Sequence, residues 1–449
     1  MLLNFKHHWN FFISRNLPVW HNTLHLMKSN FGYRHYQLGK MYTQLRTHHN
    51  LESDFYYISN GSGSNKRFLD RLTSKLKKKS YIIFLKKEYK KDGQKLLNWS
   101  KRINSKVNSL KPFLDYCGYC MILLEITSWA SKIITDKIVA ELKSNPECDK
   151  IINYYSTPKK LAPIQQLEKE LQQLHKNKDL ETIANRLYKK YHWIPVSFVG
   201  EPWDKKYFLD LLKNYIPKSV QHKDKPKSKI STKLKFLLWS LREITYLNEY
   251  RKGIFCQVTL NFRPVLNEIA HKSNLRDWKE VCLLTHEELI LAANGRDFSR
   301  LVDRRKKEFF AVHNINGKHL QIIYGKEVKK FENNFKTQKI NISEFGGVIA
   351  NRGRFVGKVK IILNHNDFNK LKPGDILVAK MTSVDYLPIM KNAAAFITDE
   401  GGLACHAAVV SREFNIPCII GTKIATQVLE DGDIVEVNAD NGVVSKISS

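Results

Sequence analysis

The chain has 449 residues, of which 43% are hydrophobic, so it is long enough for two to three globular domains and is not a disordered polymer. Lys and Arg number 74 against 43 Asp and Glu, a formal net charge of +31. No apolar run reaches the roughly 20 residues that a membrane-spanning helix requires, which argues against a membrane protein. Seven cysteines, an odd number, and no signal peptide indicate a cytoplasmic protein.

The excess positive charge is confined to one part of the chain. Residues 345–449 contain 11 basic and 11 acidic residues, so the whole +31 belongs to residues 1–344. Basic clusters lie at Lys75–Lys79, Lys86–Lys91 and His222–Lys229. Such a balance raises nucleic acid as a partner, but basic clusters are usually solvated faces, and compositional drift of an Asn-, Ile- and Lys-rich chain would also create the excess.

Residues 1–230 are expected to form a mainly helical basic domain, because their apolar residues recur at helical spacing. The prolines, glycine and tryptophans between Trp193 and Trp203 should form an irregular connector between helices. A longer helix is predicted from Thr232 to about Tyr250, with these side chains facing the core: Leu234, Leu237, Leu238, Leu241 and Ile244.

Residues 231–344 should continue as a helical linker with a β-hairpin and a hinge. Alternating apolar residues around Asn316-Gly317 predict the hairpin, and the polar stretch Lys326–Ser343 is the candidate hinge. Upstream, Cys117 and Cys120 have redox spacing but no strand before them, so buried or incidental thiols are the better interpretation. Residues 61–64 lack the context of a phosphate-binding loop and are read as a turn.

The most informative segment is Thr398–Arg412, where a histidine follows a glycine pair at the start of an amphipathic run. Gly401 and Gly402 leave backbone amides open to a ligand, and a helix from Leu403 to Phe414 would present its positive end to an anion. His406 would lie in the first turn of that helix. Taken alone, such a histidine is more often a hydrogen-bonded surface or capping residue.

The surrounding motifs change this interpretation. They occur in the order Gly353–Lys360, Gly374–Asp385, Pro388–Met390, Ala393–Gly402, Ala407–Glu413, Ile416–Thr422 and Asp431–Val437. From about Gly347 to the C-terminus the chain resembles the phosphohistidine (swivelling) domain of the PEP-utilising enzymes, the family of phosphoenolpyruvate synthase and pyruvate phosphate dikinase. Residues 241–289 are more loosely similar to the helical segment before this domain in synthase-like members.

The resemblance implies a multidomain α plus α/β protein, in which the mainly helical N-terminal region precedes a compact β/β/α swivelling domain at residues 345–449. Three short β-rich runs agree with this, at Asp375–Lys380, Ala395–Thr398 and Pro417–Gly421. The tail from Asp433 alternates around Asn441-Gly442, which predicts a hairpin.

The resemblance also implies that His406 is the catalytic residue, a nucleophile that accepts a phosphoryl group at one active site and delivers it at another. Four positions match the family's phosphate-binding motif: Thr382, Gly401, Gly402 and Arg412. On the structural alternative, the glycines only make a tight turn and Arg412 pairs with a neighbouring carboxylate. The chain departs from the family at Ala404, often threonine, and at Val384, often proline.

Neither an ATP-grasp part nor a metal-binding barrel is recognisable, so we expect no metal site or bound cofactor on this chain alone. The leading hypothesis is a phosphotransferase that needs an ATP-grasp partner carrying ATP and Mg²⁺, with pyruvate or another small molecule as acceptor. The alternative is a non-catalytic basic interaction or nucleic-acid-binding protein that retains the carrier fold. A third possibility is the C-terminal fragment of a split gene.

Overall fold

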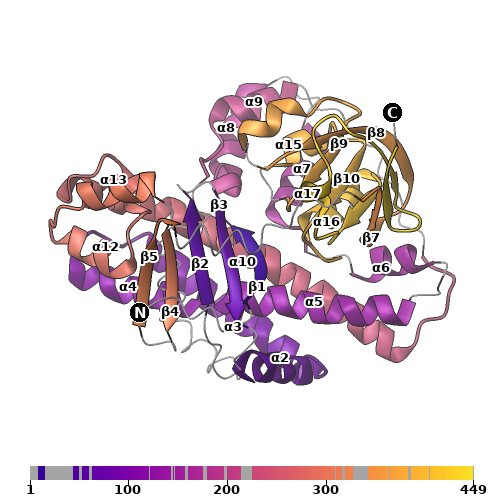
Figure 1. Ribbon diagram of the computed structural model, residues 1–449, viewed down its shortest axis with the longest axis horizontal. Coiled ribbons are helices and arrows are strands. Elements are labelled where there is room, and N and C mark those ends of the chain that lie inside the picture. Colours follow the sequence, from indigo (N-terminus) through magenta and orange to yellow (C-terminus); the bar gives the residue numbers. More distant parts are fainter. Residues whose placement is uncertain are drawn as a thin grey trace. The chain divides into compact units, whose positions relative to one another are not determined.

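The computed structural model (Figure 1) describes these residues: 9–15, 44–49, 53–59, 63–120, 122–142, 145, 147–156, 160–174, 179–196, 200–213, 225–308, 310–315, 319–326, 342–363, 365–382, 386–403 and 405–447. They belong to two compact units. The first combines residues 1–129, 165–215 and 247–336, and the second combines residues 130–164, 216–246 and 337–449. None of the helices formed by the described residues is long and apolar enough to cross a membrane.

Helices dominate the chain before residue 308, as predicted. They are α2 (Gly63–Lys75), α3 (Lys79–Ser100), α4 (Val107–Cys120), α5 (Ile122–Leu142), α6 (Cys148–Ser156), α7 (Pro163–Leu174), α8 (Leu180–Tyr191), α9 (Lys205–Lys213), α10 (Thr232–Lys272), α11 (Trp278–Val281), α12 (His286–Ala293) and α13 (Ser299–Lys307). All five side chains predicted to face the core from α10 are buried, although this helix continues well beyond Tyr250. Cys117 and Cys120 are free, buried thiols on α4, as expected.

A capping box and a buried ion pair fix the end of the helical region. The Thr285 hydroxyl accepts from the Glu288 N–H and the Glu288 carboxylate accepts from the Thr285 N–H, so two N–H groups that the helix itself leaves without a partner are satisfied. The Glu288 carboxylate also accepts two bonds from Arg305 of α13, at 2.6 and 2.9 Å. Because Arg305 is 1% exposed, losing Glu288 would leave a buried charge unpaired.

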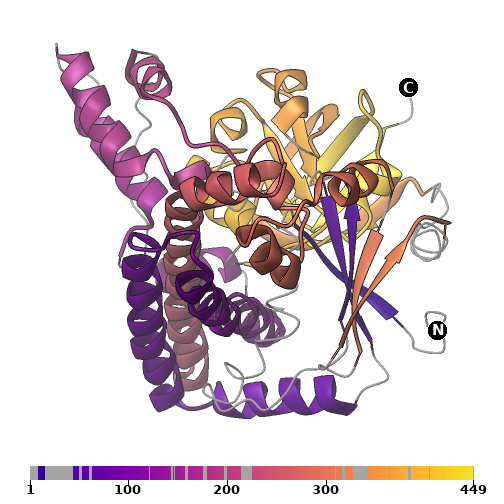
Figure 2. The ribbon, with the colours of Figure 1, turned by 90° about the vertical axis from the view of Figure 1, so that its left-hand side faces the viewer.

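The first unit also contains an antiparallel sheet, only part of which was predicted. Its order is β1 (Trp9–Arg15), β3 (Ser53–Ser59), β2 (Gln44–His49), β4 (Phe310–Ile315) and β5 (His319–Tyr324). Strands β4 and β5 confirm the predicted hairpin, whose Asn316-Gly317 turn lies outside the described residues. Figure 2 shows the indigo strands β2 and β3 beside the orange strands β4 and β5. Strand β4 pairs with β2 although it lies more than 250 residues later in the sequence. The sequence pattern did not reveal β1 to β3.

The C-terminal part of the chain forms an eight-stranded mixed sheet. Its order is β6 (Glu344–Gly346), β13 (Val443–Lys446), β12 (Ile434–Asn438), β8 (Arg354–Ile361), β9 (Ile376–Ala379), β10 (Ala395–Thr398), β11 (Cys418–Ile420) and β7 (Val348–Asn351). The four central strands β8 to β11 are parallel. The three predicted β-rich runs therefore correspond to β9, β10 and β11, and the predicted C-terminal hairpin is β12 with β13.

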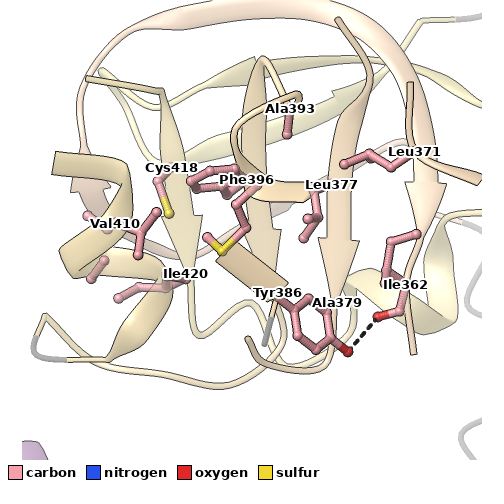
Figure 3. Packing of buried hydrophobic residues seen from close by; sticks show 14 residues of the cluster. Ile362, Leu371, Leu377, Ala379, Tyr386, Ala393, Phe396, Val410, Cys418 and Ile420 are labelled. Carbon is pink, nitrogen blue, oxygen red and sulfur yellow. Dashed lines mark hydrogen bonds between the residues drawn. The ribbon is translucent and has the colours of Figure 1, made fainter. Parts of the chain in front are cut away.

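Both faces of β9, β10 and β11 are buried, which explains the uninterrupted apolar sequences of these three strands. On one face, Leu377, Phe396 and Cys418 lie side by side on neighbouring strands (Figure 3) and pack with α15 (Leu387–Met390) and α16 (His406–Phe414). On the other, β12, β13 and α17 (Ala425–Val428) cover the alternate side chains. The boundaries at residues 230 and 344 stay predictions, and most of the candidate hinge lies outside the described residues.

Candidate active site

Two loops leave the same edge of the parallel strands. Thr398, the last residue of β10, lies opposite Ala379, the last residue of β9. The backbone pairing continues beyond the strands, because the Asp399 and Glu400 N–H groups donate to the carbonyls of Ala379 and Lys380. The carboxyl edge of parallel strands is where α/β proteins gather their ligand-binding loops. Here it holds the glycine pair and Thr382 close to the start of α16.

His406 is the first residue of α16, so it lies in the first turn as predicted, although the helix begins after its cap Cys405 and not at Leu403. Its Nδ1 is 3.0 Å from the hydroxyl of Thr382, and both side chains are only 6% exposed. Cys405 caps the helix: its Sγ accepts from the Ala408 N–H at 3.4 Å. The structure therefore brings together two of the five predicted site residues through a direct side-chain contact, 24 positions apart in the sequence.

The two glycines have different requirements. Gly401 has a φ of +132° and a Cβ added there would lie 2.8 Å from Cys405 Sγ, so only glycine fits without strain. At Gly402 the nearest atom to an added Cβ is Thr135 Oγ1, at an ordinary contact distance of 3.8 Å. The tight turn of the structural alternative thus accounts for Gly401, whereas Gly402 is not demanded by the local backbone.

Arg412 lies in the last turn of α16, and its guanidinium points back toward the glycine loop. Its Nε donates to the Ala408 carbonyl at 2.8 Å and its Nη2 donates to the carbonyl of Leu403. The first bond lies within α16, and the second ties the loop before His406 to the helix. Arg412 is half-buried, so its guanidinium is held near the start of the helix and not extended into solvent.

Asp399 fixes the glycine loop to residues 422–426 through its side chain. The sequence did not reveal this role. Its buried carboxylate accepts from the Thr426 N–H at 3.0 Å, from the Thr426 hydroxyl and from Thr422 Oγ1 at 3.3 Å. Burial raises the pKa of Asp399, although these three bonds oppose the shift. The partners lie more than 20 positions away, so no local pattern links them; the cap by Cys405 was equally hidden, because cysteine is not a usual capping residue.

Comparisons with known proteins agree with this geometry. Residues 371–442 match the family described as PEP-utilising enzyme, mobile domain. This part of the chain is thus similar to the mobile domain of PEP-utilising enzymes, and residues 345–449 are called the mobile domain below. A probable phosphoenolpyruvate synthase of Archaeoglobus fulgidus is 41% identical over 137 residues, 29% of this chain and 18% of that protein. The phosphoenolpyruvate synthase of Pyrococcus furiosus is 36% identical over 176 residues, 38% of this chain and 21% of that protein.

A third relative, the uncharacterized phosphotransferase YvkC of Bacillus subtilis, is 43% identical over 102 residues, 23% of this chain and 12% of that protein. The chain thus spans about a fifth or less of each of these relatives. Among solved structures, aconitase X of Thermococcus kodakaraensis is 18% identical over 23% of this chain and 98% of its own, with a TM-score of 0.19, which supports no argument.

The two glycines provide a matched pair of variants. Gly401→Ala should destabilise the loop by about 1–3 kcal/mol, because alanine resists the positive φ and contacts Cys405 too closely. Gly402→Ala should change local stability by less than about 1 kcal/mol. Hydrogen exchange of peptides covering residues 395–420 measures both effects. Equal protection in the two variants would contradict this distinction.

Asp399 should make the stability of the loop pH-dependent. Its raised pKa means that the folded state holds the proton more tightly than the unfolded chain, so this contribution is present at low pH. It is lost as the pH rises from about 4 through the raised pKa. Relative to Asp399→Asn, which cannot titrate, hydrogen-exchange protection of the wild-type loop should therefore fall across this window and then level off. If the ratio of wild-type to Asp399→Asn protection stayed constant or rose across this pH range, the raised pKa of Asp399 would be disproved.

Proposed function

We propose that this chain is a phosphotransfer protein in which His406 carries a phosphoryl group between two sites. The observation that carries the proposal is the bond between His406 Nδ1 and the Thr382 hydroxyl, at 3.0 Å, at the first turn of α16. It orients the imidazole, and we take the Thr382 hydroxyl as its acceptor. Neutral imidazole is a competent nucleophile near pH 7.

Thr382 determines which ring nitrogen reacts. A nucleophilic nitrogen must keep its lone pair, so in neutral imidazole the proton must lie on the other nitrogen. With Thr382 Oγ1 as acceptor, Nδ1 carries that proton and Nε2 keeps the lone pair. We therefore assign Nε2 as the phosphoryl-bearing atom and Thr382 as the residue that holds the imidazole in this tautomer.

The transfer then proceeds in two balanced steps. Nε2 attacks the phosphorus of the donor, the P–N bond forms, and the bond from phosphorus to the donor's leaving oxygen breaks. The ring gains positive charge, which the Nδ1–H bond to Thr382 stabilises. In the second step the acceptor gives up a proton to a base of its own site, and the resulting oxygen anion, the enolate in the case of pyruvate, attacks phosphorus; the P–N bond breaks and neutral imidazole is restored. Thr382 keeps the same proton on Nδ1 throughout.

The surroundings of His406 favour the phosphorylated state. The positive end of α16 lies beside it, and an anion at a helix start is stabilised by the oriented peptide groups. We propose that Gly402 gives a phosphoryl oxygen access to the backbone, since nothing in the local geometry otherwise requires glycine there. Arg412 would contribute by exchanging one of its carbonyl bonds for a phosphoryl oxygen, as guanidinium favours such pairs.

The donor and the acceptor of the phosphoryl group are inferred from the related proteins. Two of the relatives are named as phosphoenolpyruvate synthases or probable synthases, and this chain corresponds to a small share of each. We propose that an ATP-grasp module, on another chain or elsewhere in a longer protein, binds ATP and Mg²⁺ and phosphorylates His406. Pyruvate is the first acceptor to test, and its product would be phosphoenolpyruvate.

The decisive test is phosphorylation of the full chain by labelled ATP with candidate ATP-grasp partners from the same source, and separately by phosphoenolpyruvate. The wild type should acquire a label that is labile in acid and stable in base, and His406→Ala should lose it completely. His271→Ala is the matched control, because His271 is exposed on α10 and far from this loop in sequence. A label that persists in His406→Ala would overturn the proposal, as would no label from any donor.

Variants of Thr382 distinguish a role in orienting the His406 imidazole from a role in packing alone. Thr382→Val removes the hydroxyl but keeps the shape, and should slow phosphorylation roughly 5- to 150-fold, the equivalent of about 1–3 kcal/mol for one lost buried bond. Thr382→Ser should retain most of the rate. Nitrogen-15 NMR of His406 should show the Nδ1–H tautomer in the wild type and a mixture in Thr382→Val. A wild-type rate and tautomer in Thr382→Val would exclude this role.

A further inference from the structure

A long, strongly basic segment lies in the first unit, at a distance in sequence from residues 345–449. Residues 63–120, which form α2, α3 and α4, contain 16 Lys and Arg against four Asp and Glu, a net charge of +12. Folding alone does not require such an excess, because the buried core of these helices is made of apolar side chains such as Phe68, Leu85 and Phe113. The position of the charges on α3 shows how the excess is arranged.

Helix α3, every residue of which is described, separates its charges by sign. Its two carboxylates, Glu88 and Asp92, are only 7% and 5% exposed and lie on the buried side. The exposed side carries Lys87, Lys91 and Lys95, which recur every four residues and so share one face. With a rise of 1.5 Å per residue, successive members are about 6 Å apart along the helix. The result is a row of cations about 12 Å long without an exposed carboxylate of α3 among them, in which Lys91 pairs with the largely buried Glu88 at 3.8 Å.

Aromatic rings lie at one end of this lysine row. Trp99 of α3 is 5.8 Å from the ring of Tyr116 on α4, and Tyr116 is stacked on Tyr119 at 5.5 Å. All three rings are partly exposed. The Lys95 ammonium lies 4.3 Å from the centre of the Tyr116 ring, which joins the row to the rings. Tyr116 also donates to Asp92 at 3.1 Å, which holds that carboxylate beneath the surface.

We propose that this face, the lysine row of α3 with the rings of Trp99, Tyr116 and Tyr119, binds single-stranded nucleic acid. A row of cations follows a phosphate backbone, and partly exposed rings give unpaired bases a surface on which to stack. An anionic membrane fits less well, because Ile83 is the one large apolar side chain exposed along α3, whereas surface-binding helices bury an apolar face in lipid. The site is independent of His406.

The test uses the full chain and fluorescein-labelled 15-nucleotide RNA and DNA of mixed sequence, single-stranded and duplex, with anisotropy measured between 50 and 200 mM salt. The triple variant Lys87→Gln, Lys91→Gln, Lys95→Gln should bind single strands at least about tenfold more weakly at 100 mM salt. Its slope of log affinity against log salt should be shallower by about 2, since three phosphate contacts are lost at roughly 0.7 each.

A charge-matched control distinguishes this site from a general effect of net charge. The triple variant Lys189→Gln, Lys206→Gln, Lys213→Gln removes an equal number of positive charges, three, from exposed positions of α8 and α9. It should bind single strands within about twofold of the wild type. Trp99→Leu should weaken single-strand binding by about fivefold or more, whereas Trp99→Phe, which keeps a ring, should recover most of it. Single strands should bind more tightly than the duplex of the same sequence.

Three results would overturn the proposal. Equal affinity and salt slope in the wild type and the α3 triple variant would show that the lysine row is only a solvated face. Equal losses in the α3 and control variants would show a non-specific effect of charge. Binding to phosphatidylserine vesicles that depends on the lysine row, with no binding to oligonucleotides, would identify a membrane surface. Phosphorylation at His406 should be unchanged in both triple variants, so this test and that of the proposed carrier can fail separately.

Discussion

The parallel pairing of β9 with β10 is the constraint on which the candidate site depends. It places Ala379 opposite Thr398, and the ladder continues through Lys380 and Glu400 into the loops. Two segments that are separated in sequence therefore leave the sheet together. A slip of β10 by one residue against β9 would turn Phe396 to the face opposite Leu377 and move Thr382 away from His406. The packing of these two side chains thus fixes the register, and the register fixes the hydrogen bond at the site.

Local sequence patterns predicted the strands and the helix that form the site. The contacts between residues distant in sequence could be seen only in the structure. The apolar runs predicted β9 to β11, and the glycine pair before an amphipathic run predicted a helix with His406 in its first turn. The resemblance pointed to Thr382, but its contact with Nδ1 crosses 24 positions and requires the sheet. The same reason explains the missed strands: β2 pairs with β4, which lies more than 250 residues later, and no local pattern records that partner.

The charges of the mobile domain are balanced, and some of them pair with one another. Arg354 pairs with Asp440 at 3.1 Å, Lys446 with Asp433 at 2.9 Å, and Lys370 reaches both Asp367 and Asp431. Exposed pairs of this kind contribute little stability individually, but they leave the domain without a strong field of its own. Phosphorylation would then add the dominant local charge, and the carrier's two states would differ most in their electrostatics at His406.

Compositional drift does not explain the lysine row of α3. Drift toward Lys acts along the whole gene, yet residues 345–449 contain 11 basic and 11 acidic residues, whereas residues 63–120 contain 16 and four. Drift also has no reason to spare the buried Glu88 and Asp92 while leaving no carboxylate on the exposed side of the same helix. Lys91 pairs with Glu88 at 3.8 Å, which offsets part of the charge, but three lysines on one face still repel one another, and this repulsion lowers stability unless an anion is bound. This loss of stability is confined to one face of α3, beside partly exposed rings. It is the physical reason to expect a ligand there.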